Sequence, residues 1–261
     1  MLDHRGYAIT YNGEIYNYVE VRRDLESLGE TFVTSSDTEV LLKAYIRWGR
    51  DCLGHLNGMF AVAILELSSG KLFLARDRIG VKPLYFARIG PGLAFASEIK
   101  SLLCLPQIDR TQSLEHVPYF LSFGYFPEGS TGYAAIKQLR PGHWLEFCEG
   151  REATGCYWDI DEITRCRGIS RATAGTDEEL QALIEDAVTI QTVADVSVGT
   201  FLSGGLDSGI VNAVLAGKGQ FASFTVAMGG DSFDESVMAR EVAAALGTDH
   251  HQIGVAANDL L

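Results

Sequence analysis

The sequence has little positive charge and no long apolar run, and each shortage excludes a class of protein. Its 21 Lys and Arg residues stand against 34 Asp and Glu, and the formal net charge of −13 disfavours contact with nucleic acid or anionic lipid. No apolar run approaches the roughly 20 residues of a membrane helix, and the opening MLDHRGYAIT is no secretory signal. We therefore expect a cytoplasmic protein with neither a nucleic-acid nor a membrane partner.

Cysteine is also scarce, and its pattern argues against two further classes. The five cysteines are an odd number and contain no C-x-x-C pair, which disfavours a disulfide framework and a structural zinc site. They are Cys52, Cys104, Cys148, Cys156 and Cys166. We expect all five to be reduced.

The chain nevertheless has enough apolar residues for a substantial core. It contains 261 residues, 47% of them hydrophobic, which suffices for one large domain or two ordinary ones. Residues 1–155 predict an α+β domain, with a helix that ends at Gly29, a second helix that opens with SDTE, and a hairpin around SSGK. Ser36 and Glu39 form the pattern of a capping box at the start of the second helix.

The second part of the chain has a different pattern. Residues 156–175 have mixed charge and no apolar period, which indicates a linker. Residues 176–261 then alternate helices and strands, which predicts an α/β domain with a parallel sheet. The helices are expected near 177–192, 206–216 and 235–246, the strands near 196–202 and 221–228, and a short apolar stretch at 251–256.

The stretch SGGLDS, residues 203–208, lies between a predicted strand and a predicted helix. Glycines there let the backbone approach an anion closely, and the N-terminus of the next helix favours negative charge. The alternative is a tight structural turn with an ordinary acid in the first helical turn. The loop lacks the lysine of a Walker A motif, which indicates a different phosphate chemistry.

Several motifs together carry a family resemblance. SGGLDS resembles the pyrophosphate-binding loop of enzymes that adenylate a carboxylate or a carbonyl. YNGEIYN at 11–17, SDTEVLL at 36–42, RDRIGVKPLYF at 76–86 and ASEIKSLL at 96–103 resemble, in order and spacing, the glutaminase domain of glutamine-hydrolysing asparagine synthetases. The resemblance implies an incomplete N-terminal nucleophile-type amidotransferase sandwich, followed by the start of a parallel-sheet domain that binds adenine nucleotide.

The resemblance implies roles for residues of the first part. Asn12 and Gly13 would form the oxyanion hole, Glu14 would belong to the glutamine site, and Asp37 would pair with the α-amino group of glutamine. The alternatives are an Asn-Gly hairpin turn and a helix-capping acid. Arg76 and Asp77 are interpreted as a structural charge pair at a strand end.

For the second part, the resemblance implies an ATP site with Mg²⁺ held at Asp207. The ATP-binding residues would be Phe201, Ser203, Gly204, Gly205, Leu206, Asp207, Ser208 and Val226. Phe201 and Val226 would border the adenine, with simple strand core as the alternative. The adjacent His250 and His251 lack metal-ligand spacing.

The sequence also departs from the family pattern. The family's nucleophile is a cysteine at the start of the mature chain, whereas this chain begins Met1-Leu2, so no catalytic residue is assigned and no turnover is expected from these 261 residues. The family pattern extends beyond both ends, which suggests a fragment. We expect the parent protein to use glutamine, ATP and aspartate, and it could be a homodimer. The alternatives are a non-catalytic remnant that binds ligand, and a related ligase for another carboxylate.

Overall fold

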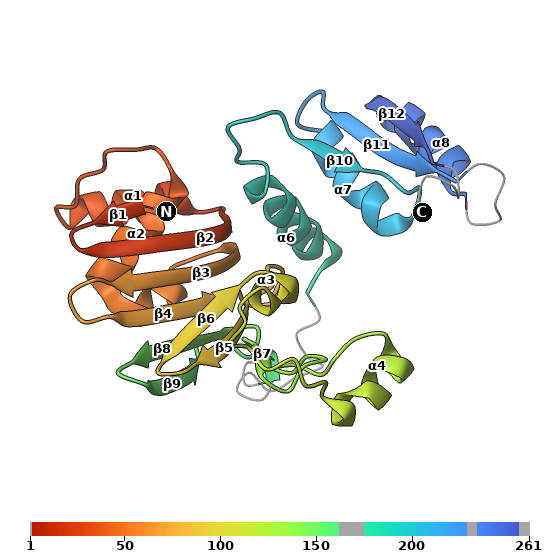
Figure 1. The fold of residues 1–261 in the computed structure, drawn as a ribbon. Coiled ribbons are helices and arrows are strands. Elements are labelled where there is room, and N and C mark those ends of the chain that lie inside the picture. Colours follow the sequence, from red (N-terminus) through yellow and green to blue (C-terminus); the bar gives the residue numbers. More distant parts are fainter. Residues whose placement is uncertain (1, 162–174, 229–233, 256–261) are drawn as a thin grey trace. The chain divides into compact units, whose positions relative to one another are not determined.

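A computed structural model describes residues 2–161, 175–228 and 234–255 of the chain (Figure 1). Contacts divide the chain into two compact units, residues 1–169 and 170–261, and each unit is described by itself. The predicted linker, residues 156–175, spans this division, but residues 162–174 of it lie outside the described part.

The first unit consists of short helices and two antiparallel sheets. Its helices are α1 (Tyr18–Ser27), α2 (Asp37–Trp48), η1 (Gly49–Gly54), α3 (Ile99–Leu103), η2 (Leu114–His116) and α4 (Val117–Phe123). Its strands are β1 (Leu2–His4), β2 (Tyr7–Ile15), β3 (Gly58–Glu66), β4 (Lys71–Arg76), β5 (Tyr85–Ile89), β6 (Gly92–Ala96), β7 (Ile136–Gln138), β8 (His143–Cys148) and β9 (Arg151–Cys156). One sheet has the order β1-β2-β3-β4-β8-β9, and the other has the order β6-β5-β7.

The alternation of side chains along β3 explains how the layers of this unit stack. Val62 packs with α1 and α2 in one buried cluster, whereas Ala61 and Ala63 pack with the second sheet in another. A third cluster joins the second sheet to Leu102 of α3. Because successive strand residues point to opposite faces, the large sheet is covered by helices on one face and by the small sheet on the other. This arrangement confirms the predicted α+β sandwich.

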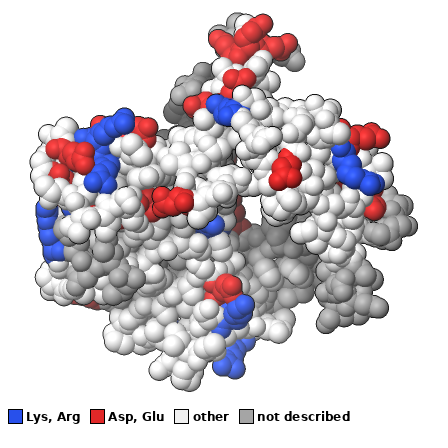
Figure 2. Space-filling view, turned by 90° about the horizontal axis from the view of Figure 1, so that it is seen from above, with Lys and Arg blue, Asp and Glu red and all other residues white. Residues whose placement is uncertain are grey.

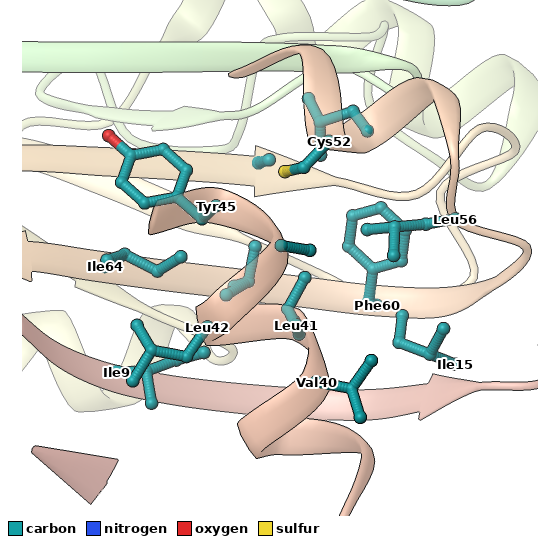
Figure 3. Packing of buried hydrophobic residues seen from close by; sticks show 14 of the residues in the cluster. Ile9, Ile15, Val40, Leu41, Leu42, Tyr45, Cys52, Leu56, Phe60 and Ile64 are labelled. Atoms are coloured by element: carbon teal, nitrogen blue, oxygen red, sulfur yellow. The ribbon is translucent and has the colours of Figure 1, made fainter. Parts of the chain in front are cut away.

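The buried cluster between the helices and the large sheet, called the helix-facing core, holds α2 against the sheet, and Ser36 caps the start of α2. Val40, Leu41, Ala44 and Tyr45 repeat with helical period and pack over β2 and β3, as Figure 3 shows for several of them. The Ser36 hydroxyl accepts the backbone N–H of Thr38, which caps the helix at its first turn. The end of α2 that carries Asp37 is therefore fixed relative to the sheet.

The second unit is a small parallel α/β arrangement. Its elements are α6 (Asp177–Ile190), β10 (Gly199–Phe201), α7 (Leu206–Ala216), β11 (Ala222–Ala227), α8 (Ser236–Leu246) and β12 (Asp249–Gly254). The strands lie in the order β10-β11-β12, and both pairings are parallel, which confirms the predicted sheet. Its buried apolar cluster consists of Leu202, Ala239 and Ala243. Among the helices that the structure describes, none combines the length and apolar character of a membrane span.

Candidate functional site

The outer edge of β2 presents backbone N–H groups that no strand covers in the described part of the chain. β1 pairs with β2 only along Tyr7–Ile9. Beyond that point, the N–H of Ile15 donates to Asp37 Oδ2 at 3.1 Å, away from β3, whereas the N–H of Tyr16 donates toward the β3 side. Because N–H groups alternate between the two edges of a strand, the N–H of Gly13 points to the same outer edge as that of Ile15.

Gly13 is required by a close approach of two strands. A Cβ atom added at Gly13 would lie 2.1 Å from the carbonyl oxygen of Met59 on β3. Gly58 has the reciprocal relation, since its added Cβ would lie 2.2 Å from the carbonyl oxygen of Glu14. No real Cβ tolerates such distances, so a side chain at either glycine would push the strands apart. The Asn-Gly pair therefore lies within a strand, and the alternative of a hairpin turn is wrong.

Asn12 and Glu14 project from the opposite face of β2 to Tyr11. The Asn12 side chain is exposed, and its Nδ2 donates to Ser97 Oγ at 3.2 Å, just beyond β6. Asn12 and Ser97 line a cavity of about 190 Å³ between the two sheets, whose other lining residues are Thr10, Tyr11, Ala61, Val62, Ala63, Leu84, Phe95 and Ala96. Ser97 thus fixes the plane of the Asn12 amide at the mouth of this cavity.

Asp37 is held beside the β2 edge by two hydrogen bonds. Its Oδ2 accepts the Tyr11 hydroxyl at 2.8 Å and the Ile15 N–H at 3.1 Å. Burial, together with the neighbouring Asp37 carboxylate, raises the pKa of Tyr11, so this hydroxyl remains a protonated donor. The carboxylate is half-buried, so it can also form an ion pair with an ammonium group.

Glu39 does not form the predicted capping box with Ser36. Its carboxylate instead accepts the N–H of Val33 and both the N–H and the hydroxyl of Thr34. It also pairs with Lys43 Nζ at 3.2 Å, and the two side chains are only 3% and 1% exposed. Burial alone would raise the pKa of Glu39, but the hydrogen bonds and Lys43 lower it to about 2. Glu39 faces inward because it pairs with the buried Lys43. Its bonds to Val33 and Thr34 hold the loop that leads into Asp37.

Arg76 and Asp77 attract each other, and each side chain also makes hydrogen bonds to backbone groups. Arg76 is 6% exposed and donates to three backbone carbonyl oxygens, those of Gly80, Lys82 and Leu139. Asp77 accepts three backbone N–H groups, those of Phe60, Val81 and Lys82. Both residues therefore shape the turn after β4, in agreement with a structural role.

Of the cysteines that the structure describes, one is buried and two lie on strands distant from β2. Cys52 is 1% exposed within the helix-facing core (Figure 3), and burial raises the pKa of its thiol to about 12. Cys148 and Cys156 lie on β8 and β9, three and four strands from β2, which is roughly 14 and 19 Å at normal strand spacing. The Cys104 thiol donates to the carbonyl oxygen of Lys100 beside α3. Cys166 lies outside the described residues.

In the second unit, the SGGLDS loop connects β10 to α7 at the carboxyl end of the sheet. Gly204 has a φ of +80°, and an added Cβ would lie 2.8 Å from the backbone nitrogen of Ala239 on α8. Gly204 is therefore needed for the approach of α8. An added Cβ at Gly205 would contact only Ser203 Oγ, at 3.4 Å, so Gly205 is the open glycine of the loop.

The two serines of the loop bond to the loop itself. The Ser203 and Ser208 hydroxyls lie 2.9 Å apart. Ser208 Oγ also accepts the Ser203 N–H at 3.1 Å and donates to the carbonyl oxygen of Gly205 at 3.2 Å. Ser203 Oγ also accepts the Gly205 N–H at 3.4 Å, so the two hydroxyls close the loop into a ring.

The first turn of α7 is open to an anion. Its N-cap is Gly205, and no side chain of the described residues caps it. Leu206 and Asp207, the first two residues of the helix, are exposed. Uncapped N–H groups and the helix dipole together favour a phosphate at this position. No cluster of three or more His, Cys, Asp or Glu side chains is found in the described ranges.

Phe201 and Val226 lie on the same exposed face of the β10-β11-β12 sheet. Phe201 pairs with Phe224 in the β10–β11 register, and Val226 lies two residues further along β11 on the same face. Their side chains are 83% and 45% exposed. Neither side chain is therefore buried in the described part of this unit.

Sequence reasoning missed the residues that support these sites. Ser97, Tyr11 and the Glu39–Lys43 pair reach their partners only through the fold. Asn212 was a signal in the sequence, because it is a polar residue in the apolar run of α7 and an amide buried there requires partners.

Charged side chains on the visible face lie in small groups. In Figure 2 the described Lys and Arg residues are scattered, and several lie next to Asp or Glu. Within the first unit, Lys71 pairs with Glu146, and Arg88 pairs with Glu152. Acidic neighbours therefore reduce the positive potential around these basic residues.

Comparisons with known proteins cover nearly the whole chain. The family model described as a glutamine amidotransferase domain matches residues 1–158, and the model described as asparagine synthase matches residues 179–261. Asparagine synthetase [glutamine-hydrolyzing] 3 of Bacillus subtilis is 36% identical over 98% of this chain and 44% of its own length. Asparagine synthetase [glutamine-hydrolyzing] 1 of the same organism is 37% identical, over 94% of this chain and 38% of its own length.

The chain spans less than half the length of these curated relatives. Among solved structures, that of the allosteric regulatory enzyme of purine biosynthesis aligns with 95% of this chain and 60% of that chain, at 17% identity. Its TM-score is 0.43, a likeness too low to support a comparison of sites.

Proposed function

Because the chain belongs to the glutamine-hydrolysing asparagine synthetase family, we propose that its first unit binds glutamine and its second binds the phosphates of ATP. The observation that carries the glutamine proposal is the open edge of β2. There the Gly13 N–H points outward on the same edge where Asp37 accepts the Ile15 N–H. This edge offers a donor for a carbonyl oxygen and a carboxylate for an ammonium group.

The chemistry of amide hydrolysis gives these groups their roles. Attack on the side-chain amide of glutamine places negative charge on its oxygen, and the Gly13 N–H with the Asn12 amide would stabilise that charge. Asp37 would bind the α-amino group, and the exposed Glu14 would border the substrate. Ser97 would keep the Asn12 amide oriented through its hydrogen bond of 3.2 Å.

We further propose that these 261 residues do not turn over glutamine by themselves. The attacking group must be a thiolate, and a pKa of about 12 keeps the buried Cys52 thiol protonated. Cys148 and Cys156 are too distant along the sheet to reach the Gly13 edge. Binding without hydrolysis is the expected behaviour of the chain as given.

The ATP proposal is supported by the loop at residues 203–208. Its backbone approaches α8 through Gly204, its serines close it into a ring, and the uncapped start of α7 faces outward. The donors fit a pyrophosphate, and the exposed Asp207 could hold Mg²⁺ jointly with phosphate oxygens. Phe201 and Val226 provide an exposed apolar surface for the adenine.

In a protein of the relatives' length, we propose the reaction that this family's name implies. Glutamine would supply ammonia, and ATP would activate aspartate as its adenylate, with release of pyrophosphate. Ammonia would then displace AMP to give asparagine. Such a protein would work in the cytoplasm, and it could assemble as a homodimer.

Glutamine binding tests the proposal directly. Isothermal calorimetry of the full chain with L-glutamine should give a measurable heat that Asp37→Asn abolishes, because the variant loses the charge that faces the ammonium group. Asp24→Asn, an exposed acid on α1, should bind as the unchanged chain does. Glutamate release should stay at the level of the buffer. Equal binding by both variants would contradict the proposed site, and release that depends on Asn12 would contradict the proposed lack of turnover.

A further inference from the structure

We propose that Asn212 is the positioning residue of the phosphate loop, a proposal that rests on the proposed ATP site. Asn212 lies in the second turn of α7 and is 0% exposed. Its hydrogen bonds go to the residues at the two ends of the loop, Phe201 and Ser208. Its role is to hold these ends at a fixed separation.

The hydrogen bonds of Asn212 connect the strand to the helix. Its Nδ2 donates to the carbonyl oxygen of Phe201, the last residue of β10, at 3.1 Å. The same nitrogen donates to the carbonyl oxygen of Ser208, in the first turn of α7, at 2.8 Å. The whole loop lies between these two carbonyl groups. One side chain therefore clamps the segment that enters the loop to the segment that leaves it.

Thr200 fixes which way the amide faces. Its hydroxyl donates to Asn212 Oδ1 at 2.6 Å, which leaves the Nδ2 side for the two carbonyl oxygens. Both donors and the acceptor of the amide are thereby used. A buried amide with every polar atom paired is rigid, whereas a partly paired one is costly.

Packing alone does not explain an asparagine at this position. Asparagine is a weak helix former, and the neighbours Ile210, Val211, Ala213 and Val214 are apolar. An aliphatic side chain of similar size would fill the same space without the cost of burying an amide. The amide is therefore explained by its bonds to the loop.

The serine ring depends on this clamp. Ser208 carries both the carbonyl group that Asn212 binds and the hydroxyl that accepts the Ser203 N–H. A shift of Ser208 would therefore move Ser203 and change the direction of the loop's N–H groups. Since phosphate recognition by backbone N–H groups depends on their direction, loss of the clamp should weaken anion binding.

Amide hydrogen exchange and pyrophosphate binding of the full chain test this role. We expect Asn212→Leu, which keeps the size and removes the donors, to speed exchange by about tenfold at Ser203 and Gly205, whose N–H groups are bonded to Ser208 Oγ and Ser203 Oγ. Its affinity for pyrophosphate with Mg²⁺, followed in ¹H–¹⁵N spectra, should fall by a similar factor. Thr200→Val removes only the orienting hydroxyl, so its effects should be smaller and in the same direction.

A control at the other end of α7 separates positioning from stability. Leu215 is 7% exposed, and Leu215→Ala should lower the melting temperature without changing exchange or affinity at the loop. The proposal is overturned if Asn212→Leu leaves both loop properties within twofold of the unchanged chain, or if Leu215→Ala changes them equally. If Asn212→Leu does not fold, unchanged loop properties in Thr200→Val overturn it.

The same experiment separates this inference from the proposed ATP site. If pyrophosphate does not perturb the loop resonances of the unchanged chain, the phosphate site is wrong. The exchange rates of the Ser203 and Gly205 N–H groups then decide alone whether Asn212 holds the loop.

Discussion

Replacing Glu39 by glutamine should change both the stability of the first unit and its dependence on pH. Glu39 and Lys43 are 3% and 1% exposed and pair at 3.2 Å. Glu39→Gln leaves the ammonium group of Lys43 buried without an opposite charge. Removal of one partner from a buried ion pair typically costs about 3–5 kcal/mol. We therefore expect the free energy of unfolding at pH 7 to fall by an amount in this range.

The pKa of Glu39 gives the size of the pH-dependent part of the free energy of unfolding. It is about 2 in the folded chain, against 4.5 for a free side chain. A pKa lowered by folding stabilises the protein above pH 4.5, and this stabilisation is lost as the pH falls toward 2. The difference corresponds to about 3 kcal/mol at neutral pH. Glu39→Gln should remove this part of the pH dependence.

Urea unfolding followed by tryptophan fluorescence at several pH values between 2 and 7 measures both effects. The three tryptophans, Trp48, Trp144 and Trp158, all lie in the first unit, so the signal reports on that unit alone. The unchanged chain should gain stability from pH 2 to 4.5 more steeply than Glu39→Gln does. If the free energies of unfolding of the unchanged chain and of Glu39→Gln change in parallel over this interval, Glu39 does not provide this pH-dependent stability.

Lys43→Met provides a matched comparison for this pair. Glu39 keeps its hydrogen bonds from Val33 and Thr34 when the lysine is removed, so this variant should lose less stability than Glu39→Gln. A larger loss in Lys43→Met would mean that the lysine, and not the carboxylate, stabilises the loop before Asp37.

The other expected outcomes concern the two proposed sites. Gly204→Ala should lower the melting temperature of the second unit, since its φ of +80° alone costs an alanine about 1–2 kcal/mol and the new Cβ meets α8 at 2.8 Å. Gly205→Ala should keep the melting temperature and weaken pyrophosphate binding; circular dichroism and calorimetry check the contrast, and equal melting temperatures would contradict it. Tyr11→Phe should cost about 1 kcal/mol of stability and weaken glutamine binding less than Asp37→Asn does, because Asp37 keeps the Ile15 N–H. Urea unfolding and calorimetry test this, and a glutamine affinity as low as that of Asp37→Asn would show that Tyr11 contributes more than orientation.

Much of the fold could be predicted because its patterns are local. The helix at Leu206–Ala216 has the predicted bounds, and the helix at Asp37–Trp48 begins inside the SDTE motif. The strand expected near 196–202 is shorter, Gly199–Phe201, since the residues before it do not join the ladder with β11. α4 was not predicted, because its aromatic residues follow no clear apolar period and none of them is buried.

The candidate sites could be predicted only where one motif contains the residues. Asn12, Gly13 and Glu14 adjoin in sequence, and so do the residues of the 203–208 loop. Their supporting contacts could not be predicted, because Ser97 is 85 residues from Asn12 and reaches it through the packing of two sheets. Glu39 shows the opposite error, since a correct local motif was overridden by a buried lysine one helical turn away.

A crystal structure of the chain with L-glutamine tests directly whether glutamine binds at the outer edge of β2. We expect glutamine at the outer edge of β2, with its side-chain oxygen within hydrogen-bond distance of the Gly13 N–H and the Asn12 amide. The α-amino group should lie against the Asp37 carboxylate. Glutamine bound elsewhere, with the Gly13 N–H and Asp37 making no contact to it, would show that the β2 edge is not the glutamine site.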